Sequence, residues 1–266
     1  MRIRILIYLL LLFNLTGCSL LPGHRNSLIK YSNNINLEII KNYSKAISRD
    51  PYNFLFYLER GRAKDEYGDF IGAINDFNYA FKINPDYRIL FHRANTKYKY
   101  GDFNGAVKDY KKLNFVDKYE EQIYYNIASA QLINFDYKNA IKNFTKSIEY
   151  DNEDEYTYLY RGNAKFKLKD FKGALNDYSK TIEINNKSYI AFNNRGVNNF
   201  KLKNYRSALE DFKKSLKINP RNYSTLYNKS LTHFALKELK KACFYLKKSI
   251  KLGKEVFEGE YLKICP

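Results

Sequence analysis

The sequence is poor in proline, glycine, histidine and cysteine, and each scarcity excludes a class of structure or site. Its 266 residues include 5 prolines, 12 glycines, 3 histidines and 3 cysteines. Because the prolines and glycines are few and follow a regular spacing, they argue against a disordered linker inside the chain. Strand patterns of alternating apolar and polar residues are also missing. An all-helical protein is therefore the expectation.

The scarce histidines leave little support for metal or triad chemistry. His24, His92 and His233 have no spacing to one another or to a cysteine that would form a zinc site or a histidine-based triad. The Gly-Asp-Phe motif lacks the lysine and following serine or threonine of a phosphate-binding loop. No pair of carboxylates stands out. The sequence predicts no enzyme, no metal and no other cofactor.

What the sequence does contain is a repeated segment. GDFIGAINDF at residues 68–77 returns as GDFNGAVKDY at 101–110, and related decapeptides start at residues 135, 169, 203 and 237. The copies share an alanine, which steps by 33 residues from Ala73 to Ala106 and by 34 residues from there to Ala140 and beyond. A fixed period of this size indicates a repeat architecture with one supersecondary element per unit.

Each unit has the pattern of two antiparallel helices. In the first unit, Phe70, Ala73 and Phe77 follow the spacing of one helix face. A second helical stretch precedes them, and the short polar joint at Gly68 leaves room only for an antiparallel hairpin. Pro85 then ends the unit, because the residue before a proline is driven out of the helical region.

These units resemble the tetratricopeptide repeat, which has small residues at its eighth and twentieth positions, an aromatic residue at the twenty-fourth and a proline at the thirty-second. Gly61, Ala73, Phe77 and Pro85 occupy those positions. The resemblance implies an all-α, right-handed superhelical solenoid of antiparallel helix hairpins. It implies a partial repeat at 31–53, repeats one to six at 54–86, 87–120, 121–154, 155–188, 189–222 and 223–255, and a capping helix at 256–266 within a solenoid of residues 31–266.

A solenoid of helix hairpins presents a concave groove built from the first helices of its repeats. The family's groove-facing positions hold Leu58, Arg62, Phe91, His92, Asn95, Tyr98, Tyr125, Asn126, Ser129, Leu159, Asn163, Phe166, Asn193, Asn194, Val197, Tyr227 and Asn228. Aromatic rings beside asparagines suit an extended peptide, since rings supply contact area and amides bind its backbone. The alternative is that some of these rings pack between repeats.

An arginine and an aspartate recur together in four of the six repeats. The pairs are Arg60 with Asp76, Arg93 with Asp109, Arg161 with Asp177 and Arg195 with Asp211. Repeat three has Ile127 and Asn143 at the two positions, and repeat six has Lys229 and Tyr245, so the acid is lost wherever the arginine is lost. We predict a structural ion pair between the helices of each hairpin. The alternative is coincidence among weakly interacting surface charges.

The N-terminus has the pattern of a signal peptide over residues 1–17. Arg2 and Arg4 precede an apolar run of about a dozen residues, which is too short to cross a bilayer as a helix. The sequence Leu-Thr-Gly-Cys ending at Cys18 resembles the lipobox of bacterial lipoproteins. It implies lipidation of Cys18, a tether over residues 18–30, and lipid anchoring in the cell envelope. Ser19 after the cysteine favours the outer membrane, and the inner membrane stays open as the alternative. The alternative is an ordinary signal peptide with an incidental cysteine.

The two remaining cysteines flank Gly253, where a helix is expected to end. A hairpin turning at Gly253 would bring Cys243 and Cys265 roughly opposite each other, and export favours a disulfide between them. The alternative is two thiols packed as small apolar groups.

The formal net charge is +18, and it is +16 without Arg2 and Arg4, since 18 − 2 = 16. So basic a surface attracts anionic lipid, acidic glycan or acidic protein. Because the basic residues are spread over every repeat, the alternative is that they only solvate outer helix faces. Nucleic acid is not an expected partner of an exported protein.

Together these features predict a non-catalytic, membrane-anchored adaptor that binds a protein or peptide partner in its groove. The alternative function is that of a surface-exposed basic lipoprotein that binds anionic glycan or lipid through charge.

Overall fold

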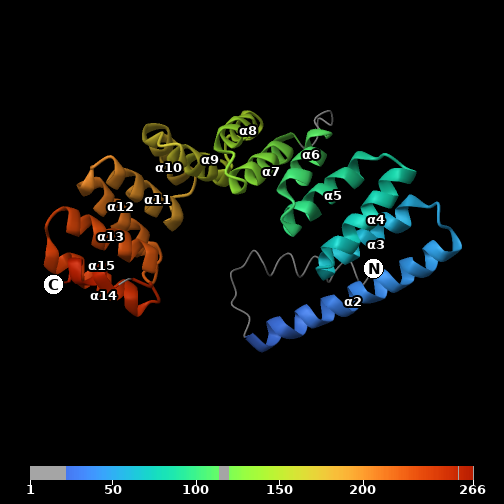
Figure 1. Cartoon of the computed structure of the whole chain (residues 1–266), viewed down its shortest axis with the longest axis horizontal. Coiled ribbons are helices and arrows are strands. Elements are labelled where there is room, and N and C mark those ends of the chain that lie inside the picture. The colour runs from blue at the N-terminus through green and yellow to red at the C-terminus, as the bar shows by residue number, and fades with distance from the viewer. Residues whose placement is uncertain (1–21, 114–119, 257, 266) are drawn as a thin grey trace. The chain divides into compact units, whose positions relative to one another are not determined.

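The computed structural model describes residues 22–113, 120–256 and 258–265, and within these ranges the regular structure is entirely helical (Figure 1). The prediction of an all-α fold built from consecutive helix pairs is confirmed. Within the same ranges, no helix is both long enough and apolar enough to cross a bilayer. The predicted signal peptide and the lipidation site at Cys18 lie outside the described residues.

The chain divides into two compact units, Met1–Tyr100 and Gly101–Pro266. The helices of the first unit are α2 (Pro22–Arg49), α3 (Phe54–Tyr67), α4 (Phe70–Ile83) and α5 (Tyr87–Tyr100). Those of the second unit are α6 (Phe103–Lys111), α7 (Glu120–Ile133), α8 (Tyr137–Tyr150), α9 (Glu155–Lys167), α10 (Phe171–Ile184), α11 (Tyr189–Lys201), α12 (Tyr205–Ile218), α13 (Tyr223–Ala235), α14 (Leu239–Lys251) and α15 (Glu258–Ile264). Neighbours in sequence pack together, as α3 does with α4 and α9 with α10.

Helix α2 begins earlier than the sequence analysis expected. Residues 22–30 were assigned to a tether, but the structure includes them in α2, whose first residue is Pro22. A proline is favourable at the first helical position because its missing N–H group would have no partner there and its φ angle already suits a helix.

The period alanines lie where the two helices of each hairpin touch. Ala73, Ala106, Ala140 and their counterparts Ala174, Ala208 and Ala242 are all fully buried. The helices also approach closely at the eighth position of the repeat, because a Cβ atom added to Gly61 would lie 2.7 Å from Cε1 of the Phe77 ring. The small and aromatic residues therefore recur in the sequence because the two helices of each hairpin pack closely at these positions.

The Gly-Asp-Phe motif builds the joint between the two helices. Gly68 has a φ of 96°, a left-handed conformation that glycine adopts without strain. Oδ1 of Asp69 accepts a hydrogen bond from the backbone N–H of Gly72 at 2.9 Å, which caps α4. A Cβ atom at Gly72 would lie 2.1 Å from Oδ2 of Asp69. The motif thus needs its second glycine because the capping carboxylate occupies the space of a side chain.

Four later joints reach the left-handed region without glycine, at Phe135, Lys169, Lys203 and Lys237. We expect Lys169→Gly to raise the free energy of unfolding by about 1 kcal/mol, because its φ of 64° is unfavourable for a residue with a Cβ atom. Urea unfolding followed by circular dichroism measures the change. As a control, Lys213→Gly in the interior of α12 should lower stability by about 1 kcal/mol. A lower stability for Lys169→Gly would contradict this account of the joint.

Candidate partner-binding face

The first helices of the second unit share a face without charged side chains. On α9 this face holds Tyr156, Tyr160 and Asn163, which are four and three residues apart and so lie on one side of the helix. The corresponding residues are Gln122, Asn126 and Ser129 on α7, Ile190, Asn194 and Val197 on α11, and Ser224, Asn228 and Leu231 on α13. We call these twelve residues the first-helix face. None is charged, although charged residues make up 28% of the chain.

Four asparagine side chains form a continuous hydrogen-bonded row across α9, α11 and α13. Nδ2 of Asn194 donates to Oδ1 of Asn163 at 3.0 Å, and Nδ2 of Asn193 donates to Oδ1 of Asn194 at 3.2 Å. Nδ2 of Asn228 donates to Oδ1 of Asn193 at 3.0 Å. We call Asn163, Asn193, Asn194 and Asn228 the asparagine ladder. All four were predicted as groove residues, and the structure brings them together.

Bonds within the protein use the oxygens of the ladder more than its nitrogens. Oδ1 of Asn163 also accepts from the Tyr178 hydroxyl at 2.9 Å. Burial raises the pKa of Tyr178, so this hydroxyl keeps its proton and acts as the donor. Oδ1 of Asn193 accepts a further bond from Thr225 Oγ1 at 3.1 Å. Within the described residues, Nδ2 of Asn163 makes no hydrogen bond, so what Asn163 has left to offer is its two amide N–H groups.

A group of tyrosines adjoins the ladder. The ring of Tyr160 lies 6.3 Å from that of Tyr125 and is stacked on that of Tyr156 at 6.5 Å, measured between centroids. We call these three residues the tyrosine cluster. Tyr156 is 51% exposed. The sequence analysis included Tyr125 but missed Tyr156 and Tyr160, although Tyr160 has the same repeat position as Asn126, Asn194 and Asn228.

Some residues predicted to line the groove pack in the core instead. Leu58 and Leu159 are 6% and 4% exposed and belong to core clusters around Phe77 and Tyr178. Phe166 is half-buried against the second of these clusters. The prediction of a partner-binding role for Leu58 and Leu159 is corrected, because both side chains are buried in these clusters and have little surface left for a partner.

The remaining predicted groove residues keep partly exposed positions or local contacts. The Tyr227 ring lies 4.8 Å from Nζ of Lys254, and the Phe91 ring lies edge-on to the His92 ring. Arg62 pairs with Glu59 on its own helix at 3.0 Å. The half-buried residues among them are Phe91, His92, Asn95 and Tyr98 on α5, Asn126 and Ser129 on α7, and Val197 on α11. The Oγ atom of Ser129 is itself buried and, among the described atoms, makes no hydrogen bond.

His92 should make the stability of the first unit depend on pH. Burial and the nearby Arg62 lower the pKa of His92 below its ordinary value of 6.5, and its ring stacks on Phe77. The folded protein therefore binds this proton less readily than the unfolded chain. The contribution of neutral His92 to the free energy of unfolding is complete above about pH 6.5. It is lost as the pH falls below that value toward the lower pKa of His92 in the folded protein.

We expect the melting temperature to fall between about pH 7.5 and about pH 5.5, and His92→Phe to reduce that fall while keeping a stacked ring. Calorimetry of both proteins at several pH values measures the melting temperatures. His233, whose pKa is also lowered by burial against the effect of Glu238, is expected to supply part of the remaining fall. A pH profile that is unchanged in His92→Phe would show that His92 does not contribute.

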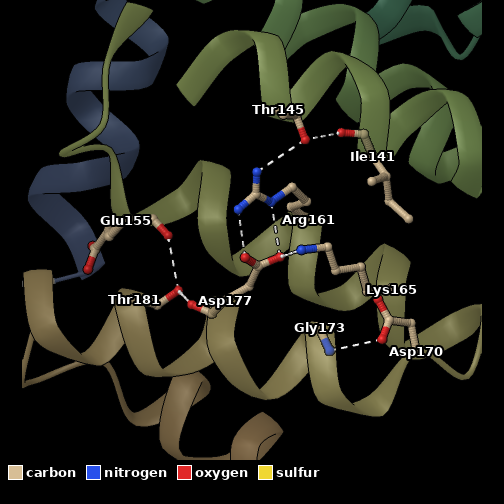
Figure 2. A network of polar contacts seen from close by, with 9 residues as sticks. All are labelled: Ile141, Thr145, Glu155, Arg161, Lys165, Asp170, Gly173, Asp177 and Thr181. Atoms are coloured by element: carbon tan, nitrogen blue, oxygen red, sulfur yellow. Dashed lines mark hydrogen bonds and ion pairs between the residues drawn. The ribbon is translucent and has the colours of Figure 1, made fainter. Parts of the chain in front are cut away.

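Each predicted arginine–aspartate pair that lies within one unit is a bidentate ion pair. Figure 2 shows Arg161, whose Nε and Nη2 donate to Asp177 Oδ2 and Oδ1 at 3.0 and 2.7 Å. Lys165 Nζ adds a contact to Asp177 Oδ2 at 2.8 Å, and Arg161 Nη1 donates to Thr145 Oγ1 of the preceding repeat at 3.1 Å (Figure 2). The arginine thus joins its own hairpin to the helix before it. We call this arrangement the arginine clamp.

Two further clamps have the same design. Arg60 pairs with Asp76 and donates to Ser44 Oγ, and Lys64 adds a second cation on Asp76. Arg195 pairs with Asp211 and donates to Ser179 Oγ, and Asn199 donates to Asp211 in place of the lysine. Arg93 and Asp109, both buried, lie in different units, and Nη1 of Arg93 donates to Asn78 at 2.9 Å.

The sequence analysis missed the bond from the clamp arginine to the preceding helix, although the sequence contains a pattern that indicates it. Sixteen residues before each clamp arginine stands a hydroxyl, at Ser44, Thr145 and Ser179, and the amide of Asn78 stands fifteen residues before Arg93. In the repeats without the arginine, the same place holds Lys111 and Lys213. The clamp is therefore a set of residues that occur or are lost together.

The C-terminal helix is fastened to the last repeat by a disulfide. Sγ of Cys243 on α14 lies 2.13 Å from Sγ of Cys265, just after α15, and their Cα atoms are 5.0 Å apart. Ile264 and Cys265 pack on Ala242 and Leu246 of α14. The structure thus brings together the two cysteines proposed as a pair, and α15 covers apolar surface that the last hairpin would otherwise expose.

Across the described ranges, no group of three or more histidine, cysteine, aspartate or glutamate side chains is arranged to hold a metal ion. The contacts described above are structural or belong to the first-helix face.

Comparison with protein families matches three segments to one family. Models of the tetratricopeptide repeat match residues 189–222 in one form and residues 121–154 and 223–253 in another. No protein of curated function is significantly similar to the chain in sequence.

Solved structures share the fold. The C-terminal part of a TPR repeat-containing protein from Cytophaga hutchinsonii superposes with a TM-score of 0.73 at 17% identity, covering 91% of this chain and 98% of that one. A tetratricopeptide repeat protein from Parabacteroides merdae gives 0.61 at 17% identity, with 91% and 98% covered. MamA from Desulfovibrio magneticus gives 0.60 at 15% identity, with 64% and 96% covered. At such identities the likeness concerns the fold alone.

Proposed function

We propose that this chain, which carries tetratricopeptide repeat segments at residues 121–154, 189–222 and 223–253, is a membrane-anchored adaptor without catalytic activity. It holds a protein or peptide partner on the first-helix face of its second unit. Its place is the bacterial cell envelope, with a lipid on Cys18 and the outer membrane favoured over the inner one. The anchoring part of the proposal is supported by the apolar run and the Leu-Thr-Gly-Cys sequence that ends at Cys18.

One observation carries the binding part of the proposal. The first-helix face is uncharged in a chain of net charge +18, and it includes three residues of the asparagine ladder and two of the tyrosine cluster. Side-chain amides and tyrosine rings are partners for an extended polypeptide, because amides match backbone groups and rings provide apolar area. An uncharged face does not favour the alternative function, in which charge recruits an anionic glycan or lipid.

Capture from the envelope tests the proposal. The full chain in detergent is used as bait, and the captured material is washed at low salt and at roughly 0.5 M salt, where exposed charges are largely screened. We expect a discrete partner that survives the second wash with wild-type bait. It should be lost with Asn194→Ala, which removes two bonds of the ladder, and retained with Asn186→Ala, whose side chain is exposed outside the face.

The alternative function predicts a different result. If all captured material is lost at roughly 0.5 M salt, and Asn194→Ala behaves like wild type, then charge is the working feature of the surface. The adaptor proposal would then be rejected.

A further inference from the structure

The asparagine ladder of the second unit has more hydrogen-bond donors than acceptors to offer a ligand. Asn163 Oδ1 and Asn193 Oδ1 each accept two bonds within the protein, and Asn194 Oδ1 accepts one. An amide oxygen has two lone pairs, so the first two oxygens are saturated. Each ladder nitrogen carries two N–H groups and donates at most one internal bond. Among the described residues, Asn228 Oδ1 accepts none, so three of the eight amide N–H groups and five of the eight oxygen lone pairs of the ladder are used internally. Five N–H groups and three lone pairs remain, and the ladder therefore offers more donors than acceptors.

This balance suits a ligand backbone that has carbonyl oxygens but lacks N–H groups. An ordinary extended peptide alternates the two, and each N–H that loses water without finding an acceptor is unfavourable by about 1–3 kcal/mol. Proline has no backbone N–H group. A proline-rich segment in the polyproline II conformation exposes its carbonyl oxygens and makes no internal hydrogen bonds. Such a segment can accept from the ladder without leaving its own donors unpaired.

The tyrosine cluster supplies the second element of such a site. Tyr156 and Tyr160 are stacked on each other beside Asn163 on the same face of α9, and Tyr156 is 51% exposed. Grooves that bind proline-rich segments are lined by aromatic rings, against which the pyrrolidine rings pack. On the neighbouring helices, Ile190 and Leu231 continue the apolar part of the face.

Charge separates this face from its counterpart in the first unit. The corresponding positions of α3 and α5 include Glu59, Arg62 and Arg88, and the last of these pairs with Asp86. The face of the second unit has no charged residue at any of its twelve positions. A segment rich in acidic or basic side chains would lose water there without meeting an opposite charge.

We infer that the first-helix face of the second unit binds an uncharged, proline-rich segment of a partner protein in the polyproline II conformation. The ladder N–H groups donate to its carbonyl oxygens, and its proline rings pack on the tyrosine cluster. This inference rests on the proposed function and specifies the chemistry of the partner.

Binding of decaproline to the full chain in detergent, measured by isothermal titration calorimetry, tests the inference. A glycine–serine peptide of equal length is the comparison, because it is also uncharged but keeps its N–H groups. We expect decaproline to bind at least about tenfold more tightly, with an affinity that changes little between low salt and roughly 0.5 M salt. Equal affinities for the two peptides, or no binding of decaproline, would overturn the inference.

Two substitutions connect the binding to the two elements of the site. Asn163→Asp keeps an oxygen for Tyr178 and Asn194 but replaces the unused N–H groups with an acceptor, so we expect about a tenfold or greater loss of affinity. Its control is Asn186→Asp, which adds the same charge at an exposed position off the face.

Tyr156→Ala should weaken decaproline binding by about tenfold, whereas Tyr52→Ala should not, since Tyr52 is 82% exposed and lies outside the face. Circular dichroism checks that each variant is folded. Wild-type affinity in folded Asn163→Asp would refute the role of the ladder donors. If Asn194→Ala loses a captured partner while decaproline does not bind the wild type, the adaptor function stands and only the proline-rich chemistry is rejected.

Discussion

Asp177→Ala is expected to lower the free energy of unfolding by about 3–5 kcal/mol, because it removes the buried counter-charge of two cations whose side chains are only 14% and 18% exposed. Asp177 has 4% of its side chain exposed and contacts both Arg161 and Lys165. Removing one partner of a buried ion pair destabilises a protein far more than replacing both partners with uncharged residues, since the remaining charge stays away from water. Urea unfolding followed by circular dichroism measures the effect.

The chain itself provides the control for this prediction. Repeat three has Ile127, Gln131 and Asn143 at the clamp positions, and Nδ2 of Asn143 donates to Oε1 of Gln131 at 2.7 Å. Placing that uncharged set in repeat four, as Arg161→Ile, Lys165→Gln and Asp177→Asn together, should recover most of the stability lost in Asp177→Ala. A value for Asp177→Ala within about 1 kcal/mol of wild type would show that the clamp behaves like an exposed ion pair.

Loss of the disulfide is expected to lower stability by about 3 kcal/mol in the chain-entropy account, given the 22 residues that separate Cys243 from Cys265. The effect should concentrate at the C-terminal end, because repeats in an array contact only their neighbours and can open separately. Helix α15 has 7 residues and is too short to be stable by itself. Without the disulfide, its hold on α14 depends only on the packing of Ile264 and its neighbours.

Hydrogen exchange with and without reductant measures this prediction. The amides of α14 and α15 should exchange faster after reduction, while those of α9 and α10 should not change. The double variant Cys243→Ala/Cys265→Ala should show the fast exchange under both conditions. Equal protection of α15 in reduced and oxidised wild type would mean that the disulfide adds nothing to the cap.

Much of the fold could be predicted from local pattern, because each helix pair is formed by residues close in sequence. The spacing of Phe70, Ala73 and Phe77 predicted a helix face, and the same residues lie buried between α3 and α4 or at their edge. The pairing of Arg161 with Asp177 was also within reach, since its members are 16 residues apart in one hairpin and vary together.

The properties of the candidate site were harder to predict from the sequence. Asn163 and Asn194 were expected to face a ligand, but their bond to each other spans two repeats and depends on how closely α9 and α11 pack. The same holds for the bond of the Tyr178 hydroxyl to Asn163, which occupies the second lone pair of Asn163 Oδ1 and leaves this residue only N–H groups to offer. Leu58 and Leu159 occupy positions that the family pattern assigns to the groove, and their burial follows from the neighbouring rings.

The sequence by itself determined the repeat period, the helix hairpins and the co-occurring clamp residues, because these rest on contacts within one hairpin or at a fixed offset along the chain. The tertiary structure decided which side chains of the first-helix face remain available and whether donors or acceptors prevail there. The physical reason is that hydrogen bonds between successive repeats consume some polar groups and leave others, and their geometry depends on the lateral packing of helices about 34 residues apart in the chain.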